Sequence, residues 1–169
     1  MFEKPLIDPL SREILYILRC EIAFNRIFER LKSKSHEISY ADVVDEIFAL
    51  RGLNNELLVR LLKFLDRSTD AHTLFYVVNS LNTENKDELK KEVSELRAQL
   101  KPFYEIRNKT LAHLERGYED NWDSFYNIMP VLKRITILLD KLNGEKLEYH
   151  WKEDRGFEID LRKELHIDE

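Results

Sequence analysis

Hydrophobic side chains recur along most of this chain at alternating steps of three and four residues, the spacing of one face of an α-helix. Three stretches show this pattern most clearly, and in the first of them Asp8 and Pro9 form a good cap and first turn. The apolar faces comprise Leu10, Ile14, Ile17, Phe24, Phe28 and Leu31 in the first, Leu89, Val93, Leu96, Leu100 and Phe103 in the second, and Phe125, Ile128, Leu132, Ile135, Leu139 and Leu142 in the third. The pattern predicts an all-α protein.

Shorter helices are expected between these stretches. Residues 40–50 form one that ends at Gly52, and Asn54 can cap another in the run NNELLVRLLKFLDR. Asp70 can cap a further helix through LFYVVNSL. Together with the long stretches, these elements predict a single-domain helical bundle of about five to seven helices.

Two prolines fall within the long helical stretches. Pro102 removes a helix hydrogen bond and clashes with the preceding turn, so we expect a kink or break at that point. Pro130 is expected to bend the last helix for the same reason.

The chain changes character after residue 143. Nine acidic and five basic residues follow Gly144, a balance typical of a solvated segment. Within it, LEYHW is compatible with a short strand and GFEIDLRKEL with a helix. We therefore expect a helical domain over residues 1–142 and a short, irregular, acidic extension over residues 143–169, packed on or trailing from that domain.

Composition narrows the class of protein. With 169 residues, 43% of them hydrophobic, the chain can bury one core. Its single cysteine, Cys20, excludes an intramolecular disulfide and a multi-cysteine metal site. No stretch approaches the ~20 apolar residues that span a bilayer, and the start has no basic region followed by an apolar run. We expect a soluble, cytoplasmic protein with no membrane partner.

No motif indicates a cofactor or a metal. The four glycines form no phosphate-binding loop, and the five histidines are scattered along the chain. We expect neither a cofactor nor a metal site. The net charge of −5 means that the surface as a whole does not attract nucleic acid, so any phosphate site must be locally positive.

One arginine occupies a position where an apolar residue is expected. Continuing the face of the second long stretch places Arg107 only ~40° from Phe103 and ~20° from Leu114 around the helix axis. A guanidinium is always charged and is almost never buried without a partner. Arg107 therefore either pairs with an anion inside the protein or faces a cavity or interface that receives an anion from outside.

An internal partner is available in the first helix. Glu21 falls on its apolar face, ~20° from Ile14, and Asn25 lies close by. A buried ion pair between Glu21 and Arg107 would satisfy both charges, and it would also hold the arginine in place for catalysis. The sequence leaves this alternative open.

The phrase RNKTLAHLE, which begins at Arg107, resembles the HEPN superfamily, and in particular its abortive-infection branch. The resemblance implies a small helical bundle that is usually dimeric. Many members are metal-independent endoribonucleases that act as toxins or phage-defence effectors, whereas others have lost catalysis and serve as binding modules. Carried over to this sequence, it implies that Arg107 and His113 are the catalytic pair and Asn108 their polar companion.

These residue types suit metal-independent cleavage of RNA. The reaction needs a base for the ribose 2′-hydroxyl, an acid for the leaving 5′-oxygen and a cation for the phosphate. Histidine can perform either proton transfer at neutral pH, and an arginine fork matches phosphate oxygens. Lys109, four residues before His113 and on nearly the same helix face, would add positive charge.

The spacing of the pair argues for two copies of the chain. On an ideal helix Arg107 and His113 lie ~120° apart around the axis and ~9 Å apart along it, so one helix does not direct both at one phosphate. Two motifs across a twofold axis would supply two histidines and two arginines. We expect a homodimer with a composite site.

Two functions therefore remain open. One is an endoribonuclease that acts on RNA and is controlled by a separate antitoxin or regulator. The other is a catalytically inactive helical dimer that binds a nucleotide, RNA or a protein, with Arg107 in a structural ion pair.

Overall fold

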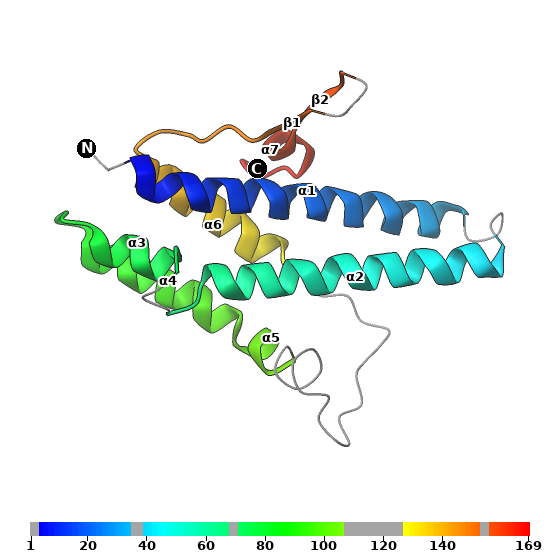
Figure 1. Cartoon of the computed structure of the whole chain (residues 1–169), viewed down its shortest axis with the longest axis horizontal. Helices are drawn as coiled ribbons and strands as arrows, with labels where there is room; N and C mark the ends of the chain where they lie inside the picture. The colour runs from blue at the N-terminus through cyan, green and yellow to red at the C-terminus, as the bar shows by residue number, and fades with distance from the viewer. Residues whose placement is uncertain (1–3, 35–38, 68–70, 107–126, 153–155) are drawn as a thin grey trace.

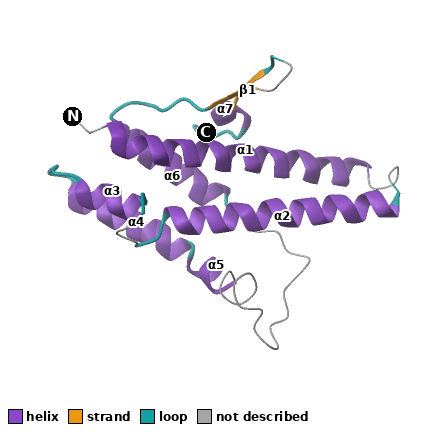
Figure 2. Ribbon diagram, viewed as in Figure 1, coloured by secondary structure: helices purple, strands orange, loops and turns teal. Residues whose placement is uncertain are grey.

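Two long antiparallel helices form the frame of the molecule (Figure 1). They are α1 (Lys4–Lys34) and α2 (Tyr40–Phe64). The computed structural model describes residues 4–34, 39–67, 71–106, 127–152 and 156–169. Within these ranges the chain forms seven helices and one two-stranded sheet, so the prediction of an all-α bundle is confirmed (Figure 2).

The helix α1 begins earlier than its proline suggested. It includes Pro9 in its interior, so the prediction that Asp8 caps this helix is wrong. Ile7 is buried in the core and Leu6 packs against it. Burying a side chain such as Ile7 is worth roughly 1.5–3 kcal/mol, comparable to the cost of a proline in a helix. Packing of this first turn therefore explains its helical conformation.

The helix α2 is continuous where two helices were expected. Gly52 lies inside it, and Asn54 is a buried interior residue rather than a cap, so both predictions are wrong. Its cap is Ser39, whose Oγ accepts a hydrogen bond from the Asp42 backbone N–H at 3.2 Å. The apolar face continues across Gly52 and packs on α1, which offsets the cost of about 1 kcal/mol for a glycine within a helix.

Three shorter helices follow α2. They are α3 (Leu74–Ser80), α4 (Lys86–Gln99) and α5 (Lys101–Ile106). The cap of α3 is Thr73 and not Asp70, which lies outside the described residues. The predicted break near Pro102 is confirmed, because α4 ends at Gln99 with Leu100 as its cap, and α5 begins at Lys101.

The helix α6 (Met129–Asn143) starts later than expected. Pro130 is its second residue, where a proline requires no hydrogen-bond donor, so the predicted bend at Pro130 is wrong. Phe125, the predicted first member of this apolar face, lies outside the described residues. The helix ends at Gly144, whose φ of 79° is left-handed.

The segment after α6 packs on the helices, which is one of the two arrangements expected for it, although its charge balance is typical of a solvated segment. It forms strand β1 (His150–Lys152), antiparallel strand β2 (Glu158–Asp160) and the short helix α7 (Leu161–Glu164), with His150 paired to Asp160. The expected strand LEYHW overlaps β1, whereas the expected helix GFEIDLRKEL is divided between β2 and α7. The core residues of this segment are Tyr149, Leu161, Leu165 and Ile167.

The helix α1 lies at the centre of the arrangement, between α2 and the C-terminal segment (Figure 1). The helix α6 packs against both α1 and α4. None of the described helices is long and apolar enough to cross a membrane.

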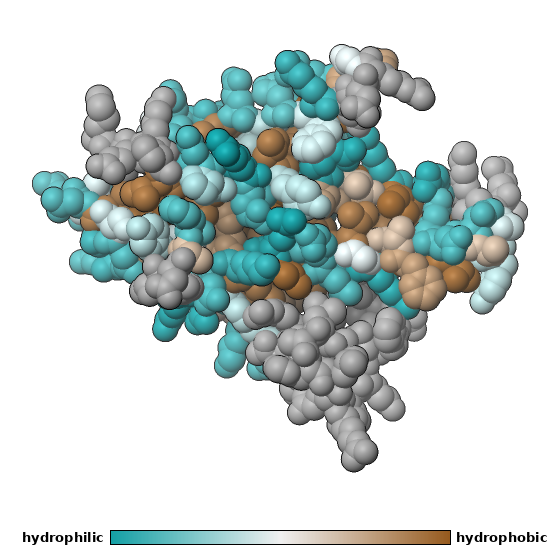
Figure 3. All heavy atoms as spheres, viewed as in Figure 1, coloured by the Kyte–Doolittle hydropathy of each residue, from teal (hydrophilic) through white to brown (hydrophobic). Residues whose placement is uncertain are grey.

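Apolar side chains remain at the surface over the distal part of the α1–α2 hairpin (Figure 3). Tyr40 is 85% exposed and Phe48 63% exposed, and Phe28 of α1 is also exposed. Large exposed apolar side chains gathered in one region are typical of an interaction surface.

Candidate functional site

Arg107, Asn108, Lys109 and His113 lie outside the described residues. Their positions relative to one another, and the expected dimeric site, stay predictions. The described chain leads directly to them, because α5 ends at Ile106.

Glu21 is a buried carboxyl group in the middle of α1. It is 6% exposed, as expected from its place on the apolar face. Burial raises the pKa of Glu21 to about 7, and a hydrogen bond from Asn25 opposes that increase. Among the described residues Glu21 has no ion pair, and its expected pairing with Arg107 stays a prediction.

Two ion pairs fix how α1 and α2 lie against each other. Arg60 Nη1 lies 2.7 Å from Glu13 Oε1 on one side of Glu21, and Arg30 Nη2 lies 2.6 Å from Glu46 Oε1 on the other side. The section of α2 that faces the surroundings of Glu21 therefore lies between Glu46 and Arg60.

This section of α2 also carries buried polar groups. Asn54 is 4% exposed, and the Nε atom of the half-buried Arg51 is buried. We call Glu21, Asn25, Arg51 and Asn54 the polar layer. Burying such groups is costly unless they are hydrogen-bonded, so the contacts that these residues make are part of how the hairpin packs.

Two residues of the polar layer, Arg51 and Asn54, are not among the candidates that the sequence predicts. The predicted helix end at Gly52 assigns Asn54 to the cap of a separate helix. Had the apolar face been continued across Gly52, positions 47, 51, 54, 58 and 61 would have followed the same three-and-four spacing. That spacing places Arg51 and Asn54 on the buried face.

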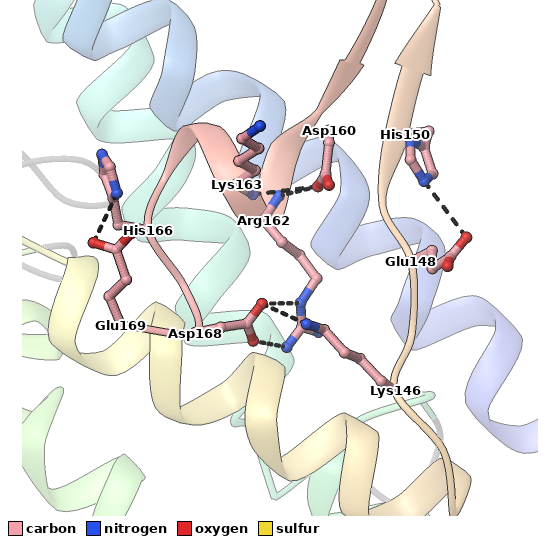
Figure 4. Close-up of a pocket in the computed structure, with 9 residues that line it drawn as sticks. All are labelled: Lys146, Glu148, His150, Asp160, Arg162, Lys163, His166, Asp168 and Glu169. Atoms are coloured by element: carbon pink, nitrogen blue, oxygen red, sulfur yellow. Dashed lines mark hydrogen bonds and ion pairs between the residues drawn. The ribbon is translucent and has the colours of Figure 1, made fainter.

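A cavity of about 430 Å³ lies in the C-terminal segment (Figure 4). His150, His166 and several charged residues line it, with Arg162 at its floor. Arg162 is 4% exposed. Its Nη1 and Nη2 donate to the two Asp140 oxygens at 3.0 and 2.9 Å.

The remaining donors of Arg162 are also used. Nε and Nη2 donate to Asp168, and Nη1 donates to the Leu147 carbonyl oxygen at 3.1 Å. Hydrogen bonds from Arg162 and Lys146 hold the pKa of Asp168 at about 2. A guanidinium has five N–H donors, all of which are engaged here. Arg162 therefore joins the end of α6 to the C-terminal segment and has no donor left for a ligand.

The described residues include no group of three or more histidine, cysteine, aspartate or glutamate side chains that could hold a metal ion. No protein-family model, no curated protein and no solved structure matches the chain. The function is therefore argued from the residues themselves.

Proposed function

We propose that the protein is a metal-independent endoribonuclease of the HEPN type, acting as a toxin or phage-defence effector in the cytoplasm. The observation that carries this proposal is the phrase RNKTLAH, in which Arg107, Asn108 and His113 occur together directly after α5. The all-α bundle supports it, because the HEPN fold is helical.

Each residue of the motif has a role in this reaction. His113 moves the proton between the ribose 2′-hydroxyl, the leaving 5′-oxygen and water. Arg107 stabilises the negative charge on the phosphate, and Lys109 adds positive charge nearby. Asn108 orients His113 or a phosphate oxygen. Because one chain supplies one such histidine, two copies form the site.

In this proposal Arg107 is available to a phosphate group and does not form a structural ion pair. A guanidinium paired with Glu21 would favour the charged carboxylate and lower the pKa of Glu21. The stability tests on Glu21 and Arg107 in the Discussion distinguish these two roles.

The exposed apolar residues of the hairpin support the homodimer. Phe28, Tyr40 and Phe48 provide apolar surface that a second copy would cover. The enzyme is then held inactive by a separate antitoxin or regulator.

The test is cleavage of a mixed RNA pool by wild type and by His113→Ala, in EDTA. We expect wild type to cleave and His113→Ala to lose at least about a hundredfold in rate, the usual contribution of an acid–base residue. His166→Ala is the matched control, because His166 is exposed in the C-terminal segment and should leave the rate unchanged. Equal cleavage rates for His113→Ala and the control variant would overturn the assignment of His113. RNA left intact by wild type would favour the inactive binding module instead.

A further inference from the structure

Cations gather at the junction of α4 and α5. Arg97 lies in the last turn of α4, and Lys101 is the exposed first residue of α5. The Arg97 guanidinium lies 5.1 Å from the centre of the Tyr104 ring. Its Nε atom is buried and has no hydrogen-bond partner among the described residues. Among the described residues, the contact that holds this arginine is therefore a ring and not a carboxylate.

A third cation reaches the same corner from α2. Tyr104 donates its hydroxyl hydrogen bond to the Leu62 carbonyl oxygen at 3.0 Å, which joins α5 to the last turn of α2. Arg67 follows that turn, and its guanidinium lies 5.5 Å from the centre of the Phe75 ring. We call Arg67, Arg97 and Lys101, with the rings of Phe75 and Tyr104, the cationic corner.

The cations of the cationic corner are held differently from several other arginines. The arginines at positions 26, 30, 60, 134 and 162 each form an ion pair with a carboxylate. Within the described part of the chain, the three cations of the corner form none. In a protein with a net charge of −5, three cations that share no ion pair are a candidate contact for an anionic partner.

We infer that the cationic corner binds the phosphate backbone of single-stranded RNA next to the proposed active site. An arginine that stacks on an aromatic ring keeps the edges of its guanidinium for phosphate oxygens. Since α5 runs from Lys101 to the residue before Arg107, RNA held here extends toward the motif. The inference rests on the proposed function, for which it supplies the path of the substrate.

The test measures binding of a fluorescent 2′-O-methyl RNA of about 12 nucleotides, which lacks the reactive hydroxyl, at several salt concentrations. Arg97→Gln with Lys101→Gln should weaken binding at least about tenfold at low salt and lower the salt slope by about 1.4, or about 0.7 for each cation. Arg67→Gln should lower the slope by about 0.7. Lys91→Gln is the matched control, because Lys91 is exposed on α4 and lies ~120° from Arg97 around the helix axis.

The outcomes separate this inference from the proposed function. If the corner variants bind like wild type while wild type still cleaves RNA, the cationic corner is not the substrate path and the nuclease proposal stands. If wild type binds through the corner and cleaves nothing, the nuclease proposal fails and the RNA surface stands. Equal binding of polyglutamate and RNA, both lost in the corner variants, would overturn the assignment to RNA. Thermal melts of every variant check that the fold is unchanged.

Discussion

Glu21 and Arg162 are both buried charged residues, but their surroundings differ. Arg162 uses all of its donors on Asp140, Asp168 and a carbonyl oxygen. Glu21 has a hydrogen bond from Asn25 and, among the described residues, no cation. Arg162 therefore belongs to a structural ion-pair network, whereas Glu21 is a titratable group in the interior of the hairpin.

Replacement of Arg162 should destabilise the fold. Arg162→Leu leaves Asp140 without its buried partner and is expected to lower the free energy of unfolding by about 3 kcal/mol in urea denaturation at neutral pH. Arg26→Gln removes an exposed pair with Glu164 and should cost less than about 1 kcal/mol. Similar losses in the two variants would contradict the structural role of Arg162.

The titration of Glu21 gives a prediction with a definite sign. Its pKa in the folded protein is about 7, above its ordinary value of 4.5, so the folded state binds more protons than the unfolded state between these values. Stability should therefore fall by about 3 kcal/mol as the pH rises from about 4.5 to about 7. Glu21→Gln should remove this part of the pH dependence and be more stable than wild type at pH values above about 7.

The opposite result would identify an ion pair. If Glu21→Gln is destabilised by roughly 3–5 kcal/mol at neutral pH, the carboxylate is charged and paired in the folded protein. The melting temperature of Arg107→Ala distinguishes the same two alternatives. Our account expects this variant to melt like wild type, whereas a structural pair with Glu21 would lower its melting temperature.

The helices show where local sequence signals mislead. The apolar faces of α1, α4 and α6 were evident from spacing alone, and the break at Pro102 followed from its chemistry. Gly52 and Asn54 gave strong local signals for a helix end and a cap, yet packing on α1 carries α2 through both. The polar layer could not be placed without that tertiary contact.

Gly52 provides a test of this explanation. It is exposed inside α2, and a Cβ atom there would meet nothing within 4 Å, so Gly52→Ala should raise the free energy of unfolding by about 1 kcal/mol. Gly144→Ala is the contrasting variant, because the left-handed φ of 79° makes a side chain costly by about 1–2 kcal/mol. Both values come from denaturant titration. A destabilised Gly52→Ala would mean that α2 does not run straight through this position.

At the scale of the whole molecule, the C-terminal segment is held by packing, whereas the proposed active site is assigned from residue types alone. Charge counts suggested a solvated C-terminal segment, but Tyr149, Leu161 and Ile167 bury it against the helices. A charge count does not reveal such packing, because a few buried apolar side chains are enough to hold a charged segment against the helices. The motif from Arg107 to His113 was visible in the sequence as residue types, while its geometry lies outside the described residues. In the proposed mechanism that geometry also requires a second copy of the chain.

The most direct measurement is the chemistry of the RNA ends that purified wild-type protein produces in EDTA. Attack by the ribose 2′-hydroxyl leaves a 2′,3′-cyclic phosphate on one fragment and a 5′-hydroxyl on the other, and our account predicts these ends. Fragments with 5′-phosphate ends would show that the ribose 2′-hydroxyl is not the attacking group, and cleavage that EDTA abolishes would show a metal-dependent reaction. Either result would contradict the account.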